Sequence, residues 1–476
     1  MANITVGPII GKVTHSSARV LIECDSAKQI EMLLTPSTGE PISVKKRVKS
    51  NRPGVFVAKG LKAGTTYKVA FPSASCPTSC SLRTPLANPK SMNFGFVSCN
   101  EPDDLEKGYD PWGHLFTNQV STGHIDVLLH MGDQVYGDLT FKRCQNIWDD
   151  HDGAISPARK TKMLELYRNL YRSKWSESSQ RKTMANVSNL MIWDDHEVTD
   201  SWGGKKEFHN KSERDHYIKG IAQQVYREYQ RQLWRDLGNG VDSTPPHGTL
   251  EDHDHRWGKI GLLMIDMQGG RSHSGSNRLL GAKQWEKIKK RFAKDGTFKA
   301  TEALVMVSSV PLAYLSAEHT AKSIAMRFAA LPLPVLWGYA EKLKHNLMDH
   351  WSYKSHVPEQ KRLLNLLSKW KGWNDKRSIH VLGGDVHLCM KSTVTHNGAE
   401  LFQQSISSPI THTPGKVAKK ALKKSLEKSD TFGNGFSCDH RVASAKADPN
   451  YGILQVRIKD DGQAVMSSKI IVPPIP

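Results

Sequence analysis

The chain has 476 residues, which is enough for two or three domains with a large core. Its hydrophobic content of 38% and charged content of 24% are ordinary for a soluble globular protein. No apolar run approaches the ~20 residues that cross a bilayer. The net charge of +19 favours an acidic partner or substrate, but we find no zinc-finger spacing, aromatic RNA-binding signature or basic heptads, so no specific nucleic-acid partner is expected.

The N-terminal residues and the cysteines bear on the cellular compartment in which the protein is expected. Residues 1–6 lack the basic and apolar regions of a signal peptide, so we expect an intracellular, cytoplasmic protein unless a leader has been removed. Seven scattered cysteines do not form a disulfide framework. Cys76 and Cys80 are close in sequence but lack the second pair that a zinc site needs, so we interpret them as free thiols or as one local disulfide.

Residues 1–83 have a pattern typical of an all-β unit, with short alternating stretches separated by turn residues. The segment Gly60–Tyr67 resembles the tyrosine corner of fibronectin type III and related sandwiches, in which the tyrosine hydroxyl bonds to nearby backbone. A linker rich in proline follows at residues 85–89. We therefore expect a small β-sandwich domain over residues 1–88, acting as a lid, spacer or docking module, and a second domain over residues 89–476.

From about residue 90, strand-like and helical patterns alternate, which indicates an α/β fold. Apolar periodicity predicts helices over 156–175, 213–237, 281–292 and 358–370, the third beginning with packing of Leu280 rather than with a polar cap. Five apolar runs read as buried strands: Phe94–Val97, Val127–Leu129, Leu190–Trp193, Ile260–Ile265 and Ile379–Leu382.

Each of these five runs is followed by Asp, His or Cys. Buried parallel strands deliver their last residues to the carboxyl edge of a sheet, so we expect one sheet edge to gather all five ends. The residues at these ends are Cys99; Asp133, Tyr136 and Asp138; Asp194, Asp195, His196 and Glu197; Asp266, Arg271 and His273; and Asp385 and His387.

Closely spaced carboxylates repel one another unless a cation lies between them. Asp133 and Asp138 are close enough for this argument, although Asp133 alone could also bond backbone N–H groups in a capped turn. Because the pattern recurs at five strand ends, we interpret it as a single polynuclear metal site.

The segment Lys416–Lys428 predicts a basic amphipathic helix. One interpretation is weak contact with an anionic membrane or a polyanion. The alternative is a solvated surface helix that packs through Val417, Leu422 and Leu426.

Three motifs, Gly-Asp-Gln-Val-Tyr at 132–136, Trp-Asp-Asp-His-Glu at 193–197 and Gly-Asp-Val-His at 384–387, together resemble the PhoD-like alkaline phosphatase family. This family is a branch of the calcineurin-like metallophosphoesterases. The order of the motifs agrees with the family over roughly residues 92–455, with further matches at Ser98-Cys99, Ser309-Val310-Pro311, Leu280-Gly281, Gln284-Trp285, the Asp349/Trp351/Tyr353 segment, Ser407-Ser408 and Asn450-Tyr451-Gly452.

The resemblance implies a four-layered α/β/β/α sandwich that holds a mixed iron–calcium cluster. Carried over by position, Fe(III) would be held by Cys99, Asp133, Tyr136 and His387. Asp133 would bridge to one or two Ca²⁺ ions completed by Asp195 and Asp385. Thiolate and phenolate are suitable ligands for iron and poor ones for calcium.

The resemblance also implies the catalytic and substrate-contacting residues. His196 and Asp195 are the expected catalytic residues, and His196 and Arg271 the expected contacts to substrate. His196 would contact phosphate or protonate the leaving oxygen, or alternatively would only orient Asp195. Glu197 is expected to support His196 or a helix N-terminus rather than to bind metal.

The implied function is hydrolysis of phosphoric esters, with metal-bound hydroxide attacking phosphorus in line and without a covalent intermediate. Two alternatives remain: a phospholipase D-like phosphodiesterase on the same site, and a non-enzymatic module that binds a polyanion.

Some segments depart from the expected pattern. Residues 147–152 nearly repeat residues 192–197, but only the second copy follows a strand-like run, so we assign the second copy to the site. The chain has Asp-Met-Gln at 266–268 where relatives often have Asp-Thr-Arg, and Arg271 could reach the same space. It has Gly137-Asp138 where relatives often carry Glu, and the twin-arginine export signal of many relatives is not visible.

Overall fold

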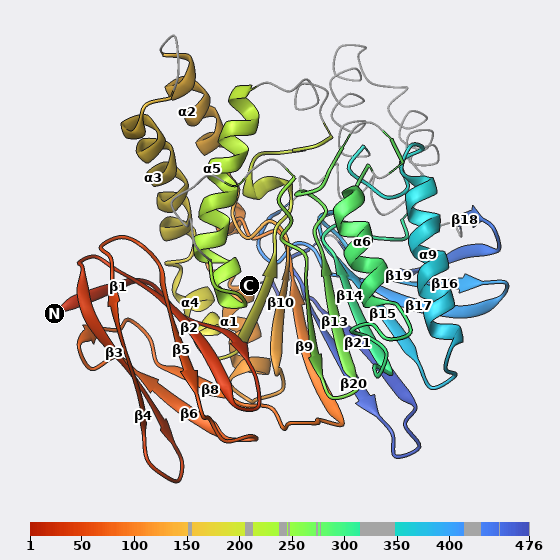
Figure 1. Ribbon diagram of the computed structural model, residues 1–476, viewed down its shortest axis with the longest axis horizontal. Helices are drawn as coiled ribbons and strands as arrows, with labels where there is room; N and C mark the ends of the chain where they lie inside the picture. The colour runs from red at the N-terminus through yellow and green to blue at the C-terminus, as the bar shows by residue number, and fades with distance from the viewer. Residues whose placement is uncertain are drawn as a thin grey trace.

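The computed structural model describes residues 1–150, 155–204, 213–237, 245, 248–272, 275–276, 278–314, 348–413, 430–446 and 448–475. These residues form a mixed α/β structure with four sheets (Figure 1). Three predictions lie outside the described residues: the basic helix Lys416–Lys428, the site residue His273, and His151-Asp152 of the near-repeat.

Two four-stranded sheets are built from the N-terminal residues, with strand orders β5-β2-β1-β7 and β4-β3-β6-β8. The hydroxyl of Tyr67 accepts a hydrogen bond from the Lys62 backbone N at 2.8 Å, which confirms the bond predicted for the tyrosine corner. The strands are β1 (Ala2–Val13), β2 (Ser17–Cys24), β3 (Lys28–Pro36), β4 (Ile42–Val48), β5 (Gly54–Lys59), β6 (Thr66–Ala70), β7 (Ala74–Ser75) and β8 (Cys80–Arg83).

A five-stranded sheet follows, with the order β11-β10-β9-β20-β21. Its first three strands are parallel, and the C-terminal hairpin β20–β21 joins antiparallel to β9. The strands are β9 (Ser91–Val97), β10 (Val127–Met131), β11 (Ser188–Ile192), β20 (Tyr451–Ile458) and β21 (Ala464–Ile471).

An eight-stranded sheet has the order β12-β13-β14-β15-β17-β16-β19-β18, and its strands β13, β14, β15 and β17 are parallel neighbours. The strands are β12 (His253–Trp257), β13 (Ile260–Ile265), β14 (Ala303–Ser308), β15 (Ser378–Gly383), β16 (Cys389–His396), β17 (Ala399–Ile406), β18 (Asp430–Gly433) and β19 (Phe436–Lys446).

The expectation of a single sheet edge is therefore wrong. All five predicted strands form, but β9, β10 and β11 belong to one sheet and β13 and β15 to another. The open side of β9 pairs with the hairpin strand β20, Phe96 opposite Gly452, so β9 has no free edge for β13 or β15.

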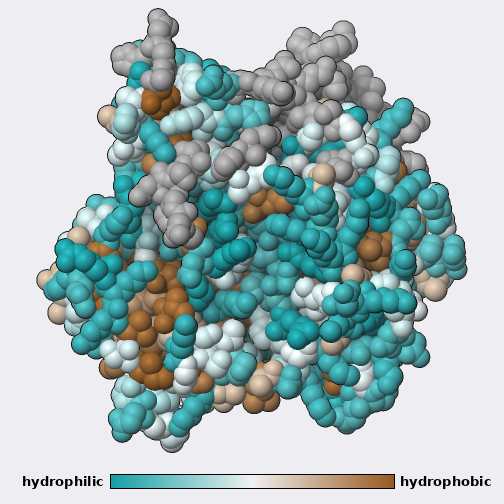
Figure 2. Space-filling view, in the orientation of Figure 1, coloured by the Kyte–Doolittle hydropathy of each residue, from teal (hydrophilic) through white to brown (hydrophobic). Residues whose placement is uncertain are grey.

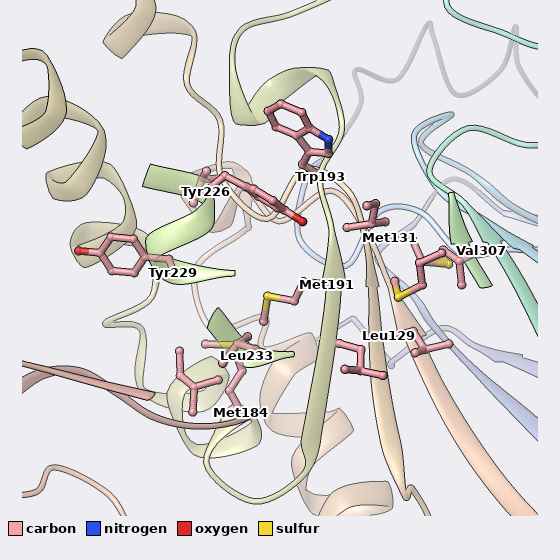
Figure 3. Packing of buried hydrophobic residues seen from close by; sticks show 14 of the residues in the cluster. Leu129, Met131, Met184, Met191, Trp193, Tyr226, Tyr229, Leu233 and Val307 are labelled. Atoms are coloured by element: carbon pink, nitrogen blue, oxygen red, sulfur yellow. The ribbon is translucent and has the colours of Figure 1, made fainter. Parts of the chain in front are cut away.

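The two larger sheets share a core. Leu129 and Met131 of β10 pack in one cluster with Leu262 and Met264 of β13. Figure 3 shows this core, in which Met191 and Trp193 lie toward Tyr226 of α5 on one side and Met131 lies toward Val307 of β14 on the other.

Helices cover the outer faces of these sheets. Trp285 of α6 and Leu367 of α9 share a second cluster with Leu263 of β13, and Trp112 of α1 shares a third with Leu128 of β10. The helices are α1 (Pro111–Leu115), α2 (Asp138–Asp149), α3 (Pro157–Lys174), α4 (Ser178–Met184), α5 (Glu213–Tyr229), α6 (Gly281–Arg291) and α9 (Val357–Gly372), with short turns η1 (Pro102–Asp104), η2 (Phe116–Val120), η3 (Asp195–Glu197) and η5 (Arg231–Leu233).

The four predicted helices are present, three of them within two residues of the predicted ends. The helix predicted over 213–237 ends at Tyr229, and η5 follows after one residue. As predicted, Leu280 precedes α6 without a polar side-chain cap of its own, and the Leu279 and Leu280 amides donate instead to Glu359.

The exposed surface and the state of the cysteines can be compared with what the composition predicts. The face in Figure 2 is largely hydrophilic, and the largest of its hydrophobic patches lies over the N-terminal sheets. All seven cysteines are free thiols, so Cys76 and Cys80 form no disulfide. Among the described helices, none is both long and apolar enough to span a membrane.

Candidate metal centre

The ligand candidates sit in tight turns just after the strands. Cys99, Asp133, Asp385 and His387 have φ angles of 56°, 57°, 63° and 51°, in the left-handed region that non-glycine residues seldom adopt. Such strain persists only where the surrounding structure holds it, and it concentrates at functional sites. The turns thus direct side chains from β9, β10 and β15 toward one place.

An acidic cluster lies at this place. Asp133, Asp194, Asp195 and Asp385 each offer a carboxylate oxygen, and these oxygens all lie within 4.8 Å of one another. A second combination within the same limit joins Asp133 and Asp195 with a ring nitrogen of His196. Asp133 and Asp194 are each only 1% exposed. Carboxylates this close and this buried are strongly destabilising as anions unless a cation compensates them.

The crowding of these carboxylates shifts their pKa values. Burial, together with neighbouring negative groups, raises the pKa of Asp133 and of Asp194 well above the usual range. Burial also raises the pKa of Asp195 to about 6, against the opposing effect of His196. Burial would raise the pKa of Asp385, but the pKa is lowered overall, because His350, 3.2 Å from its carboxylate, acts together with the charges of His387 and His196.

Sulfur and phenol donors lie beside the carboxylates. The Cys99 Sγ is 3.3 Å from Asp133 Oδ2 and accepts a hydrogen bond from Ser408 Oγ at 3.1 Å. Burial, followed by the charge of Asp385, raises the pKa of the Cys99 thiol to about 12. The buried Tyr136 hydroxyl has the Cys99 thiol beside it but lacks a well-formed hydrogen bond. This donor set fits a metal ion that accepts thiolate, phenolate and carboxylate together.

His387 approaches the same group from the turn after β15. Its backbone N donates to Ser408 Oγ at 3.2 Å, the serine that also contacts Cys99. The ring of His412 lies between two predicted ligands, with its centroid 4.2 Å from that of His387 and 5.6 Å from that of Tyr136.

His196 lies beside the cluster, where carboxylates surround its ring. Its Nδ1 is 2.9 Å from Asp138 Oδ2, and its ring centroid is 4.1 Å from that of Tyr136. Burial alone would lower the pKa of His196, but the carboxylates of Asp195 and Asp138 raise it to about 10. Asp138 thus faces His196 rather than the acidic cluster.

The end of β13 contributes no carboxylate to the cluster. Asp266 accepts hydrogen bonds from Trp193 Nε1 and from the backbone N of Gln268 and Gly269, at 2.7 to 2.9 Å. Gln268, which stands where relatives often have arginine, donates to Asp194 Oδ1 at 2.6 Å. The guanidinium of Arg271 is buried in an ion pair with Asp349, so its predicted contact with substrate stays a prediction.

The near-repeat of the site motif takes another place. Residues 147–149 end helix α2, where Trp148 packs on Tyr217 and Asp149 pairs with Arg214 at 2.8 Å.

Sequence reasoning named Asp194 and Ser408 but gave neither a role at the metal site, and it did not name His350 or His412. Strand alternation would send Asp194 and Asp195 to opposite faces, but Asp194 caps the turn η3, and both carboxylates reach the cluster. His350 follows Asp349 in a segment that the motifs had singled out. His412 is a lone histidine in a loop, and no sequence signal marks it.

Comparisons with known proteins give a family match and a partial sequence match. The family model described as PhoD-like phosphatase matches residues 94–441. Alkaline phosphatase D of Bacillus subtilis (strain 168) is 25% identical over 164 residues, which are 34% of this chain and only 26% of that protein's length.

Solved structures match the fold. A structure described as that of PhoD has a TM-score of 0.64 at 16% identity and covers 98% of this chain and 90% of its own, which shows a shared fold. GAP50, described as the anchor in the inner membrane complex of Plasmodium, has a TM-score of only 0.36 at 11% identity over 81% of this chain and 85% of its own, too low to support an argument. Because the family model covers most of its length, this chain belongs to the PhoD-like phosphatase family.

Proposed function

We propose that this chain is a metal-dependent hydrolase of phosphoric esters. The observation that carries the proposal is the buried acidic cluster, in which four carboxylates lie within 4.8 Å of one another and beside a thiol and a phenol. Family membership supports a phosphoester as the substrate class.

The donor chemistry supports two kinds of metal site. Cys99, Tyr136 and His387, with Asp133, would hold Fe(III), because thiolate, phenolate and imidazole suit iron. Asp133 would bridge to Ca²⁺ (one or two ions), completed by Asp195 and Asp385, because calcium prefers carboxylate oxygen. Asp194 adds a further carboxylate to this side. When bound, such metals activate water for in-line attack on phosphorus and neutralise charge on the phosphate.

His196 has the geometry to act on the substrate. Its Nδ1 is engaged by Asp138, so its second ring nitrogen can contact a phosphate oxygen or give a proton to the leaving oxygen. His196 would therefore place a hydrogen-bond donor beside the carboxylates. This role is compatible with direct hydrolysis, in which no covalent intermediate forms between enzyme and phosphate. Arg271 would reach phosphate only after leaving Asp349.

We also propose the division of the chain into a β-sandwich domain (1–88) of fibronectin type III type and a metallophosphoesterase domain (89–476) with the layer order helix, sheet, sheet, helix. The separate hydrophobic cluster of the N-terminal sheets supports the first part. The packing of α1 on β10 and of α6 and α9 on β13 supports the second.

The function is tested by turnover of p-nitrophenyl phosphate and of bis(p-nitrophenyl) phosphate, before and after removal of metals with a chelator. We expect monoester cleavage that the chelator abolishes and that added iron and calcium restore. The variant Asp133→Asn should lose more than about a hundredfold of the activity, because it removes the proposed bridge between metals. Asp149→Asn in the near-repeat is the matched control and should retain full activity.

Cleavage of the bis ester alone would replace the phosphatase assignment by a phosphodiesterase of the phospholipase D-like kind. Full turnover in chelator, or in Asp133→Asn, would contradict the metal-dependent mechanism.

A further inference from the structure

Glu197 follows the cluster residues Asp194 and Asp195 in sequence, but its carboxylate is not among those that converge there. Glu197 is 1% exposed. Its Oε2 accepts the backbone N–H groups of Asp133 at 3.0 Å and Asp194 at 2.8 Å. Its Oε1 accepts the backbone N–H of Gln134 at 2.9 Å and the Nε2 of Gln230 at 3.0 Å.

These four hydrogen bonds use the full capacity of the carboxylate. An ionised carboxylate has about four lone-pair positions, so none is left for a metal ion. Glu197 therefore differs from Asp133, Asp194 and Asp195, whose oxygens converge on one another.

The amides that Glu197 binds belong to two different turns. Asp133 and Gln134 follow β10, whereas Asp194 follows β11, and both turns carry members of the acidic cluster. Hydrogen bonds to a charged acceptor are stronger than neutral ones, and losing one would leave a buried amide unsatisfied. One side chain thus ties together the two turns, including the strained turn at Asp133, where φ is 57°.

Gln230 holds Glu197 from the opposite side. Gln230 is fully buried just after the end of α5, and its Nε2 donates to Glu197 Oε1 and to the Tyr171 hydroxyl, both at 3.0 Å. Because an ionised carboxylate can only accept, the amide nitrogen of Gln230 must face Glu197. The Tyr171 ring is itself stacked on Tyr229, with centroids 4.6 Å apart, so the support is rigid.

We propose that Glu197, held by Gln230, is the positioning residue of the metal centre: it fixes the distance between the turns after β10 and β11 and binds no metal itself. The inference rests on the proposed function only in assuming that these turns hold metal. The link between the turns is a statement about backbone hydrogen bonds and can be tested without metal.

If Glu197 served only the general stability of the fold, its loss would lower the free energy of unfolding without a specific effect on these two turns. Glu228→Gln provides the matched control, because Glu228 is a 5% exposed carboxylate on α5 that pairs with Arg168 at 2.6 and 2.7 Å. It lies two residues from Gln230 and accepts no amide of either turn.

The experiment compares the full-length wild-type chain with Glu197→Gln, Gln230→Met and Glu228→Gln. Amide hydrogen exchange of peptides spanning residues 131–136 and 190–197 is measured in metal-stripped protein, and Ca²⁺ and iron binding are measured by equilibrium dialysis. In Glu197→Gln we expect exchange at 131–136 to rise by about tenfold or more, because the Asp133 and Gln134 amides lose a charged acceptor.

Variants whose amides exchange faster should also bind metal more weakly. Loss of a group that orients ligands typically weakens metal binding by about 10- to 100-fold, which we expect for Glu197→Gln. Gln230→Met should show a smaller change of the same kind, and it carries the test if Glu197→Gln does not fold. Glu228→Gln should unfold more easily but keep wild-type exchange in both peptides and wild-type metal affinity.

The inference is overturned if exchange and metal affinity in Glu197→Gln and Gln230→Met stay within about twofold of wild type, or if Glu228→Gln changes them equally. Absence of metal binding in the wild-type chain would instead refute the proposed function, and the exchange data would still decide whether Glu197 holds the turns.

Discussion

At the residue scale, the chemistry of the centre depends on how charged side chains constrain one another. Burial would lower the pKa of His196, but the carboxylates of Asp195, Asp138 and Asp200 raise it. Asp138 is the partner that fixes the ring, since its Oδ2 lies 2.9 Å from Nδ1 and its Oδ1 accepts the Asp200 amide at 2.6 Å. Asp138 should therefore determine which ring nitrogen faces the substrate.

The variant Asp138→Asn tests this role of the pair. The amide cannot stabilise a protonated imidazole, so we expect kcat to fall by about 10- to 100-fold while the metal content stays unchanged. Steady-state kinetics combined with elemental analysis gives both quantities. An unchanged kcat, or a loss of metal in parallel with activity, would show that the pair does not serve the substrate.

At the element scale, the turns after the strands create the site. Gly132 directly follows β10 with a φ of 102°, and a Cβ at this position would lie 2.5 Å from the Cβ of Asp194. The turns after β10 and β11 can approach this closely only because position 132 has no side chain.

Gly132→Ala should therefore force the two turns apart. We expect a loss of about 1–3 kcal/mol in the free energy of unfolding and a clear loss of bound metal. Gly123→Ala is the control, because Gly123 also has a positive φ, 71°, but a Cβ there meets no atom within 4 Å. In the control, only the strain of a positive φ should lower the free energy of unfolding, and the metal content should stay at the wild-type level. Equal losses of stability and metal in both variants would argue against crowding between the turns.

Much of this architecture can be predicted from the sequence, because burial of a parallel strand leaves a continuous apolar run. The run at 260–265 corresponds to β13 residue for residue, and the run at 127–129 is the start of β10. Apolar runs do not specify which strands pair. The division into two sheets depends on β20 pairing with β9, a contact between residues more than 350 positions apart.

The site was predictable to the extent that its residues directly follow buried strands. Asp133, Asp195 and Asp385 do so and converge as expected. Asp266 also follows a buried strand, but its carboxylate accepts hydrogen bonds from Trp193 and from backbone amides. The spacing of residues in the sequence does not reveal these bonds. His412 comes from a loop, where no periodicity restricts the direction of a side chain.

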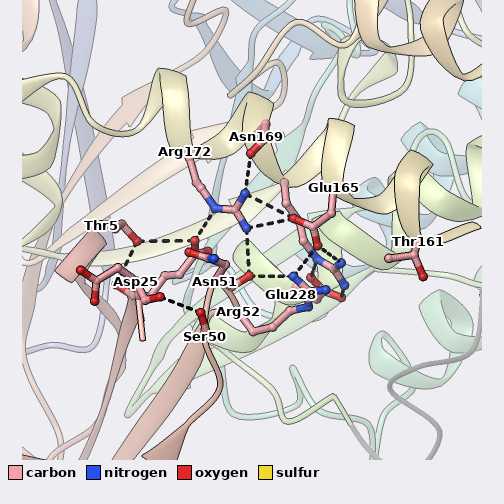
Figure 4. Close-up of polar contacts among 12 residues, drawn as sticks. Thr5, Asp25, Ser50, Asn51, Arg52, Thr161, Glu165, Asn169, Arg172 and Glu228 are labelled. Carbon is pink, nitrogen blue, oxygen red and sulfur yellow. Dashed lines mark hydrogen bonds and ion pairs between the residues drawn. The ribbon is translucent and has the colours of Figure 1, made fainter. Parts of the chain in front are cut away.

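At the scale of the whole molecule, the N-terminal sheets are joined to the helices by buried charges. Glu23 of β2 is fully buried and pairs with Arg172 of α3 and with the hydroxyl of Tyr229 of α5. Figure 4 shows Arg172 between Asn51 of the N-terminal unit and Glu165 of its own helix, with Arg52 also reaching Glu165, at 2.5 Å.

Removing Glu23 should weaken this connection strongly. In Glu23→Ala the guanidinium and the hydroxyl lose a buried partner, and we expect the free energy of unfolding to fall by about 3 kcal/mol, measured by urea denaturation. Asp236→Asn is the control at the same boundary: Asp236 pairs with Arg19 of β2 but is 80% exposed, so its loss should change stability by less than about 1 kcal/mol. Similar losses in the two variants would show that burial of the Glu23 network contributes little.

The most direct test of the central claim is elemental analysis of the purified wild-type chain together with its visible absorption spectrum. We predict iron and calcium bound to each chain and an intense visible band from tyrosinate or thiolate coordinated to Fe(III), with Cys99 and Tyr136 as the donors. A colourless, metal-free chain that hydrolyses phosphoesters at full rate would contradict the account.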